Sequence, residues 1–183
     1  MKFCNLCGAS VSHRIPDEDD RPRYVCDACG FVHYQNPRVI VGVLPTWRDQ
    51  VLLCKRAIEP RHGLWTLPAG FLENEETTME GAMRETWEEA RARVKNESLY
   101  RIFNLPHISQ VYMFYRAELS SDEYAAGPES LDVQLFDEPD IPWQQLAFPV
   151  VSQTLRSYFE DRKVGKYPIQ NLDIRFPVLK KRS

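Results

Sequence analysis

Apolar residues recur along the chain in runs and alternations that predict a sheet of several strands. Segment 39–44 is rich in β-branched residues and ends at Pro45, and segment 50–56 follows a turn-like stretch at 47–49. Two such runs around a short turn are typical of a hairpin. Further strands are predicted at residues 99–105, 110–119 and 131–136, and a C-terminal helix at 149–160. The basic tail after Lys163 is weakly patterned, and no element is predicted there.

A long helix is predicted at residues 77–94, after a loop at 57–76. Thr77 is followed three residues later by Glu80, which is the form of a capping box. In a capping box each side chain satisfies a backbone amide at the start of the helix. The pair therefore fixes where the helix begins.

The predicted helix has two unlike sides. At about 100° per residue, Glu88 and Glu89 lie within about 60° of Glu85, on either side of it. Gly81 lies on the same side and is expected to leave room for a bulky anionic ligand. The opposite side carries an apolar stripe that consists of Met79, Met83, Thr86, Trp87, Ala90 and Val94. We expect the stripe to pack on the sheet and the three glutamates to face outward together.

This grouping of glutamates has a physical cost. Like charges three and four residues apart destabilise a helix by a few tenths of a kcal/mol per pair. Divalent cations such as Mg²⁺ or Mn²⁺ take carboxylate oxygens and would offset the repulsion. A glutamate-rich face alone is more often solvated surface, so the residues before the helix decide between the two interpretations.

Composition narrows the class of protein. The chain has 183 residues, of which 43% are hydrophobic and 27% charged, as in a globular domain with a small appendage. Its net charge of −3 argues against broad binding to a nucleic-acid backbone. No apolar run approaches the roughly 20 residues that cross a bilayer, and the N-terminus lacks the pattern of a signal peptide. We therefore expect a cytoplasmic protein with no membrane partner, for which nucleic acid is an unlikely ligand.

The N-terminal segment 1–36 contains a separate group of candidate metal ligands. Its apolar content is too small for an independent core, yet it holds two Cys-x-x-Cys pairs, formed by Cys4, Cys7, Cys26 and Cys29. Four thiolates at this spacing are typical of a closed, structural zinc site, which would supply the folding energy that the core lacks. Two disulfides or a redox pair are the alternatives, and the absence of a secretion signal disfavours them. The remaining Cys54 lies in a predicted strand, where a buried, inert thiol is expected.

Segment 70–92 resembles the Nudix box. That signature is a glycine, five residues, a glutamate, seven residues, Arg-Glu, an aliphatic, any residue, Glu-Glu, any residue, a glycine and an aliphatic. Six positions match at the required spacing, namely Gly70, Glu76, Arg84, Glu85, Glu88 and Glu89. Three residues depart from the usual pattern: Thr86 replaces an aliphatic, Arg91 replaces a glycine, and Glu75 stands where glycine is common. These departures leave the carboxylates intact but bear on the backbone around them, because glycine often marks a left-handed or crowded position.

The resemblance implies a Nudix-type α/β/α sandwich with a mixed sheet, preceded by a small zinc ribbon. The implied organisation is a ribbon at 1–36, a hydrolase domain at 37–163 and a tail at 164–183. The implied reaction is attack of water on a pyrophosphate that is linked to another moiety. A homodimer is expected from the same resemblance.

The resemblance also implies roles for individual residues. Glu85, Glu88 and Glu89 would bind Mg²⁺ or Mn²⁺, the Gly70 carbonyl would complete the shell, and Arg84 would orient a carboxylate. The general base would be a box glutamate or a later loop glutamate, for which Glu129 is the candidate; it is as readily a turn cap.

Three further residues are candidates for contact with substrate. Arg56 would meet a phosphate, or is a solvated strand end. Phe71 would stack on a base, and Glu76 would bind substrate or cap the loop structurally.

The order of motifs indicates a substrate class. Zinc-ribbon Nudix proteins include bacterial NADH pyrophosphatases, whose second signature Ser-Gln-Pro-Trp-Pro-Phe-Pro is absent from the corresponding residues 104–110. The chain is more similar to the zinc-ribbon ADP-ribose/FAD pyrophosphatases, which implies cleavage of FAD to FMN and AMP, or of ADP-ribose to AMP and ribose 5-phosphate. The alternatives are an NADH pyrophosphatase, an RNA-decapping hydrolase, and a non-catalytic regulator that senses nucleotides.

Overall fold

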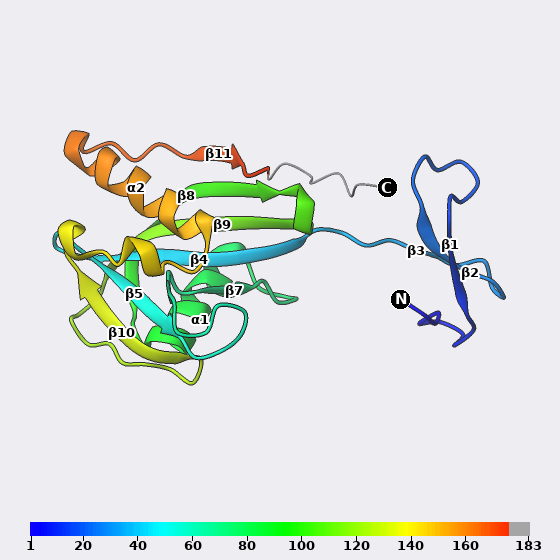
Figure 1. Ribbon diagram of the computed structural model, residues 1–183, viewed down its shortest axis with the longest axis horizontal. Coiled ribbons are helices and arrows are strands. Elements are labelled where there is room, and N and C mark those ends of the chain that lie inside the picture. Colours follow the sequence, from blue (N-terminus) through cyan, green and yellow to red (C-terminus); the bar gives the residue numbers. More distant parts are fainter. Residues whose placement is uncertain (176–183) are drawn as a thin grey trace. The chain divides into compact units, whose positions relative to one another are not determined.

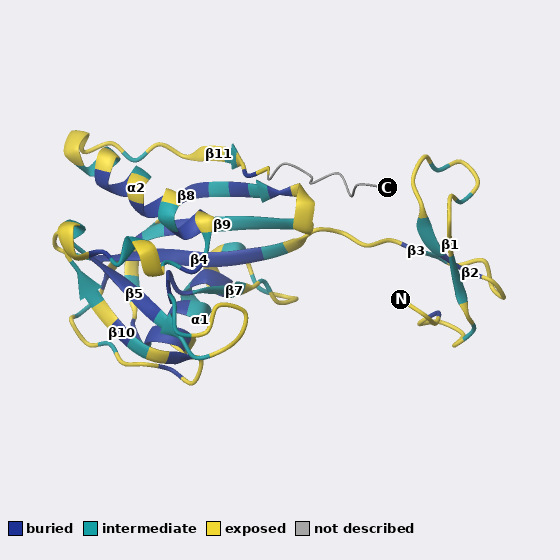
Figure 2. Ribbon diagram, viewed as in Figure 1, coloured by how far each residue is buried: buried dark blue, intermediate teal, exposed yellow. Residues whose placement is uncertain are grey.

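The computed structural model describes residues 1–175 and divides the chain into two compact units (Figure 1). The first unit comprises Met1–Pro37, and the second begins at Arg38. The first holds an antiparallel sheet in the order β1-β2-β3, with β1 at Val11–Arg14, β2 at Arg23–Cys26 and β3 at Val32–His33. Most of its side chains are exposed (Figure 2). The unit is therefore too small to rely on a hydrophobic core.

The second unit is built on one mixed sheet in the order β10-β5-β4-β9-β8-β11. The short strands β6 (Trp65–Thr66) and β7 (Ala69–Phe71) pair with β5 and β4. Strands β4 and β9 run parallel, as do β8 and β11, and the other neighbours are antiparallel. The bounds of the long strands are Arg38–Trp47 for β4, Gln50–Arg56 for β5, Val94–Leu105 for β8, Gln110–Leu119 for β9, Ser130–Phe136 for β10 and Gln170–Asp173 for β11.

Helices cover both faces of this sheet (Figure 1). Helix α1 spans Thr78–Ala90 and α2 spans Pro149–Val164, and short 3-10 turns lie at Pro106–Ile108, Glu138–Asp140 and Trp143–Gln145. Alternate residues of β4 serve the two faces, because side chains of a strand point to opposite sides in turn. Val41 and Val43 pack with Ala82 of α1, whereas Leu44 packs with Leu155 of α2. The predicted α/β/α sandwich with a mixed sheet is thus confirmed.

Strand β4 continues beyond its predicted end at Pro45. That residue is paired with Ala117 in the parallel register with β9, although its nitrogen has no hydrogen to donate. The next residue compensates, since the Thr46 hydroxyl donates to the Ala117 carbonyl at 3.1 Å. The strand then turns through Arg48, which has a φ of 54°, into the predicted hairpin with β5.

Helix α1 begins as predicted and ends earlier. The Thr77 hydroxyl accepts from the Glu80 amide at 3.2 Å, and the Glu80 carboxylate accepts from the Thr77 amide at 2.8 Å, so the capping box is confirmed. The prediction that the helix reaches Val94 was wrong. Arg91 adopts a left-handed conformation with φ 49° and ends the helix after Ala90. Glu75 also has a positive φ, of 68°, so both residues take backbone conformations that glycine adopts most readily.

The predicted apolar stripe of α1 was partly wrong. Trp87 and Met79 are exposed, while Glu89 is buried at 5% relative exposure. The helix packs along the edge that carries small residues, because these allow its backbone to approach the sheet closely. Gly81 lies in that contact: a Cβ there would meet the Glu76 carboxylate at 2.6 Å and the Val41 methyl at 3.0 Å. The space expected beside Gly81 is therefore filled by the protein itself.

The loop before β10 fastens the end of α1. The amides of Gly127 and Ala125 donate to the carbonyls of Glu89 and Ala90, at 3.0 and 2.9 Å. These carbonyls are among the four that a helix end leaves without internal partners. Gly127 lies so close to the Glu88 carbonyl that a side chain would collide with it. The loop that carries Glu129 is thereby held against the glutamate-bearing helix.

The segment after α2 forms strand β11, which the sequence pattern did not predict. It pairs in parallel with β8, from Gln170 opposite Arg101 to Asp173 opposite Asn104. Arg101 is 1% exposed; its guanidinium bonds the Asp161 carboxylate at 2.7 Å and the Pro168 carbonyl at 2.7 Å. One buried cation thus joins β8, α2 and the C-terminal segment. No helix within residues 1–175 is long and apolar enough to cross a membrane.

Replacing Arg101 with methionine should lower the free energy of unfolding by about 2–3 kcal/mol, because the buried guanidinium loses its hydrogen bonds to the Asp161 carboxylate and the Pro168 carbonyl. Chemical denaturation of the Arg101→Met variant measures the change. The matched control is Lys163→Met, which removes a surface pair with Glu160 and should cost less than about 1 kcal/mol. Equal stability of the Arg101→Met variant and the wild type would contradict the assigned role.

Candidate functional site

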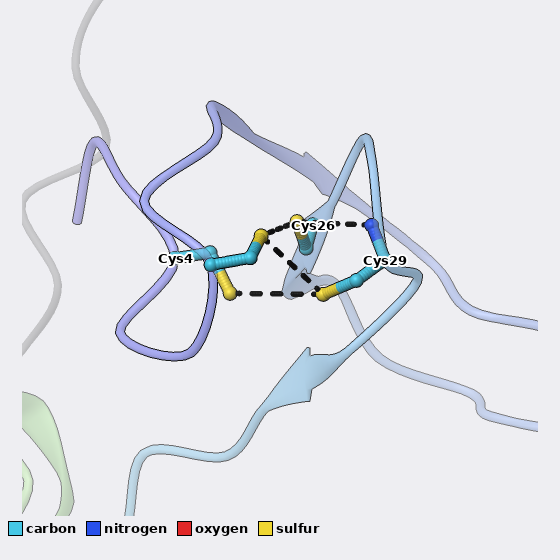
Figure 3. A group of neighbouring side chains, drawn as sticks. Cys4, Cys26 and Cys29 are labelled. Carbon is cyan, nitrogen blue, oxygen red and sulfur yellow. Dashed lines mark hydrogen bonds between the residues drawn. The ribbon is translucent and has the colours of Figure 1, made fainter.

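The four cysteines of the first unit come together from two turns, one of which follows β2 at Cys26; Figure 3 labels Cys4, Cys26 and Cys29. Their sulfur atoms all lie within 4.8 Å of one another, with Cys4–Cys29 at 3.9 Å, Cys7–Cys26 at 3.4 Å and Cys7–Cys29 at 3.6 Å. Four thiolates around one zinc ion are about 3.8 Å apart when each Zn–S bond is about 2.3 Å. The arrangement therefore matches a tetrahedral Cys₄ site.

Two backbone amides donate hydrogen bonds to sulfur atoms of this cluster. The Leu6 amide donates to the Cys4 sulfur and the Cys29 amide to the Cys26 sulfur, each at 3.4 Å. Mainly because of the Cys29 amide, the pKa of Cys26 falls to about 6. All four cysteines are free rather than joined in disulfides. The residues fit a structural zinc ion.

In the second unit, the Arg84 side chain is the centre of a network on α1. Its Nε and Nη2 atoms bond the two carboxylate oxygens of Glu76, at 3.0 and 2.7 Å. Its Nη1 atom bonds Glu85 at 2.8 Å and Glu88 at 3.0 Å. Its Nη2 atom also donates to the Phe71 carbonyl at 3.1 Å. These contacts match the five N–H donors of a guanidinium group.

This network sets the charge state of the loop carboxylate. The Arg84 guanidinium, together with the Glu73 amide at 2.8 Å, lowers the pKa of Glu76 to about 2. Both oxygens of Glu76 are occupied by these donors. The position favours a residue that holds Arg84 over one that contacts substrate.

Glu85 lies against Gly70 of β7. A side chain at Gly70 would occupy the position of the Glu85 carboxylate, so only glycine allows this approach. Burial raises the pKa of Glu85, and the neighbouring Arg84 opposes that rise. The register of β7 with β4, in which Gly70 pairs with Val41, fixes the glycine beneath the helix.

Glu89 is the most buried of the three helix glutamates. Its carboxylate accepts from the Ala69 amide at 3.2 Å. Burial raises its pKa to about 8, and the charges of Glu85 and Glu129 act in the same direction. A buried carboxylate with one hydrogen bond retains oxygen lone pairs that a cation can use.

The carboxylates of Glu85, Glu88 and Glu89 lie in one region, but their oxygen atoms do not gather around a single point. Among residues 1–175, only the four cysteines place their ligand atoms all within 4.8 Å of one another. Arg84 holds one oxygen of Glu85 and one of Glu88. Three neighbouring carboxylates form a set of hard oxygen donors, and the residues therefore fit Mg²⁺ or Mn²⁺.

Glu129 and Arg56, two candidates predicted outside the box, lie near these glutamates. The Glu129 carboxylate is close enough to raise the pKa values of Glu85 and Glu89, while its own carbonyl accepts from the Ala57 amide at 2.8 Å. Arg56 at the end of β5 lowers the pKa of Glu89 through its charge. Its Nε donates to the Pro60 carbonyl at 2.9 Å.

Three residues beside the site escaped the sequence analysis. The guanidinium carbon of Arg38 lies 5.0 Å from the centre of the exposed Phe71 ring, and that of Arg56 lies 5.2 Å from the Phe148 ring. Tyr112 is near both arginines, whose charges oppose the rise in its pKa that burial causes. Arg38, Tyr112 and Phe148 belong to three different elements, so no local motif could have grouped them.

Comparisons with known proteins agree with this geometry. A family model described as "Nudix N-terminal", of the zinc-ribbon type, matches residues 2–35, and one described as "NUDIX domain" matches residues 36–155. The ADP-ribose pyrophosphatase of Methanocaldococcus jannaschii is 29% identical over 79% of this chain and 82% of its own length. The NAD-capped RNA hydrolase NudC of Photobacterium profundum is 32% identical over 72% of this chain. The chain spans about half the length of that NudC relative, 47% of which is matched.

Solved structures give the same family. A NUDIX hydrolase from Nitrosomonas europaea aligns over 95% of this chain and 99% of its own, with 53% identity and a TM-score of 0.92. A bifunctional NMN adenylyltransferase/ADP-ribose pyrophosphatase from Francisella tularensis, complexed with AMP and a manganese ion, covers 70% of this chain and 42% of its own at 20% identity. With a TM-score of 0.60, that second likeness concerns the fold alone.

The raised pKa of Glu89 predicts how the stability of the protein changes with pH when no divalent cation is added. A pKa raised from 4.5 to about 8 means that the folded state holds the proton more tightly than the unfolded state. The contribution of protonated Glu89 to the free energy of unfolding is therefore complete below pH 4.5, and it is lost as the pH rises through 8. The Glu89→Gln variant stays neutral, so its melting temperature should exceed that of the wild type by several degrees at pH 9 and match it near pH 4.5.

Thermal melts across this pH range measure the difference. Glu88→Gln is the matched control for loss of one carboxylate, because the Glu88 side chain is 53% exposed and its charge has little burial cost. A pH-independent difference between Glu89→Gln and the wild type would contradict the burial argument.

The cysteine cluster predicts about one zinc ion per chain in purified protein, measured by elemental analysis. Cys26→Ser should lose the zinc, because three thiolates bind it far more weakly than four. Cys54→Ala removes a buried thiol outside the cluster and should retain full zinc content. Equal zinc content in both variants would rule out the Cys₄ assignment.

Proposed function

The chain belongs to the Nudix hydrolase family, and on that basis we propose that it hydrolyses the pyrophosphate of FAD or ADP-ribose. The observation that carries the proposal is the Arg84 network, which arranges the box glutamates around the backbone of Gly70 and Phe71. A non-catalytic regulator would have no use for a complete and costly set of neighbouring carboxylates.

The reaction adds water across the pyrophosphate bond. The water oxygen bonds to one phosphorus, the bridging P–O bond breaks, and the bridging oxygen leaves on the other phosphate. ADP-ribose then yields AMP and ribose 5-phosphate, and FAD yields FMN and AMP. The proton of the water passes to a general base of the site.

Glu85, Glu88 and Glu89, with the Gly70 carbonyl, are the residues that would hold Mg²⁺ or Mn²⁺. Such ions, when bound, activate water and neutralise charge on the phosphates. Arg84 positions the glutamates and Glu76 positions Arg84. Glu129 is our candidate for the general base, because its charge is close enough to raise the pKa values of Glu85 and Glu89 and its loop is fastened to the helix end.

The surroundings of the carboxylates suit a dinucleotide. Arg38 and Arg56 supply positive charge, and the rings of Phe71, Phe148 and Tyr112 lie beside them. An arginine stacked on a ring offers its outward N–H groups to phosphate while the ring offers an apolar surface to a base. The similar length of the ADP-ribose pyrophosphatase relative supports the same class of substrate.

NADH or an NAD-capped RNA is the second candidate. It is favoured by the identity to NudC, although the matched region covers only part of that protein. All of these substrates contain an adenosine 5′-phosphate that is joined to another phosphate through a pyrophosphate bond, so the same residues would act on each. A homodimer remains a prediction from the family resemblance.

The substrate class predicts AMP release from FAD, ADP-ribose or NADH in the presence of Mg²⁺ or Mn²⁺. Separation of the products by chromatography identifies the preferred substrate by its kcat/KM. Greater activity on NADH or on NAD-capped RNA would transfer the assignment to the second candidate. Cleavage of NAD-capped RNA is followed by the appearance of RNA with a 5′-monophosphate, because its adenosine stays in the RNA. No AMP from the first three substrates and no 5′-monophosphate RNA from the fourth would refute the proposal.

Glu88→Gln should lower turnover on the preferred substrate by on the order of 100-fold or more, because a ligand carboxylate is lost while the helix is kept. Glu75→Gln, at an exposed glutamate of the loop before α1, is the control and should retain activity. Circular dichroism checks that both variants are folded. Undiminished turnover by Glu88→Gln would show that this glutamate has no part in the chemistry.

A further inference from the structure

A cavity of about 480 Å³ lies at the end of the β4–β5 hairpin, away from the box glutamates. Its size is within the roughly 300–1,000 Å³ of small-molecule sites. Thr46 and Trp47 of β4 line it, whereas Val41 of the same strand pairs with Gly70. Five residues along a strand correspond to roughly 17 Å. The cavity is therefore separate from the proposed hydrolytic site.

The cavity is positively charged in a chain that is negative as a whole. Its lining includes four cationic side chains, Arg48, Lys95, Arg116 and Arg162, and two carboxylates, Asp49 and Glu118. Four positive charges and two negative charges leave +2, against −3 for the whole chain. Glu118 is also engaged elsewhere, because its carboxylate accepts from the Asn96 amide group at 3.1 Å. The local field therefore attracts an anion.

Arg116 of β9 is a half-buried cation of the lining whose side chain makes no hydrogen bond to any described residue. Its Nε atom is buried without a hydrogen bond to any described residue. The group is held in place by its stacking on Tyr167, with the guanidinium carbon 4.1 Å from the ring centre. A buried donor without an acceptor costs about 1–3 kcal/mol, and more when it is charged. Because Arg116 also lines the cavity, an anion bound there would compensate the guanidinium charge through its other N–H groups.

The aromatic residues of the cavity restrict what that anion can be. Tyr158 stacks on Tyr167 with ring centres 5.9 Å apart and planes 19° apart, and Arg116 also lies over the Tyr167 ring. Those rings are already engaged with each other and with the arginine, so they offer little to a nucleotide base. Recognition must come from the charged groups, and guanidinium groups match the oxygens of phosphate in two-point hydrogen bonds.

We propose that this cavity is a second ligand site, which binds a phosphoryl group through Arg116 with help from Arg162 and Lys95. Arg162 lines the cavity and is held by two hydrogen bonds, one of them to a carboxylate that offsets part of its charge. Its Nη1 donates to the Asp49 carbonyl at 2.6 Å, and its Nη2 donates to the Glu138 carboxylate at 3.0 Å. Inorganic phosphate, pyrophosphate and a phosphomonoester share the recognised chemistry.

Isothermal titration calorimetry with full-length protein and no added divalent cation tests the proposal. The probes are inorganic phosphate, pyrophosphate and AMP. Wild-type protein should bind at least one of them saturably, and Arg116→Gln should weaken that binding by about tenfold or more. Lys95→Ala, at an exposed position, should weaken it by about twofold to fivefold and serves if Arg116→Gln does not fold.

Arg93→Gln is the matched control. Arg93 is an exposed arginine that lies over the Trp87 ring, outside the cavity lining, so its loss should leave the affinity unchanged. Tighter binding of AMP than of phosphate would identify a phosphomonoester as the ligand, and the reverse order would identify an inorganic anion. No saturable binding of any probe, or wild-type affinity in the two cavity variants, would overturn the proposal.

Discussion

The hydrogen bonds of Arg84 are the interaction on which the arrangement of the second unit's chemistry depends. One guanidinium joins helix α1 to the loop that follows β7, through Glu76 and the Phe71 carbonyl, and it also holds Glu85 and Glu88. Carboxylates that would otherwise repel one another and drift into solvent are thereby kept on the side of the helix that faces Gly70. The cation compensates their charge within the protein, so the set is preorganised before any ion or substrate arrives.

Local signals predicted the elements that carry this network. The capping box at Thr77 and Glu80, the strand patterns and the spacing of the box glutamates depend on residues close in sequence, and the structure has them where expected. The face of α1 was harder to predict, because hydrophobicity alone placed Trp87 inward and Glu89 outward. Close approach by small residues decided the packing instead, and it left the large ring exposed and the carboxylate buried.

Other parts of the site could not be read from the sequence because they depend on tertiary pairing. Arg38 and Tyr112 come together through the parallel register of β4 and β9, in which Arg38 pairs with Gln110 and Ile40 with Tyr112. Phe148 is the N-cap residue of α2 and is far from Arg38 and Tyr112 in the sequence. The buried Arg101 gave no signal either, since its partners Asp161 and Pro168 belong to segments whose positions only the folded chain defines.

The hydrogen bonds of Arg101 show that the folded domain extends beyond the residues that the family model matches. The family model ends at residue 155, yet α2 continues to Val164 and β11 reaches Asp173. A boundary drawn at the edge of the matched region would cut the helix and strip a buried cation of its counter-ion. The autonomous folding unit is therefore longer than the inherited signature, and its last strand is as much a part of the sheet's architecture as the box is of its chemistry.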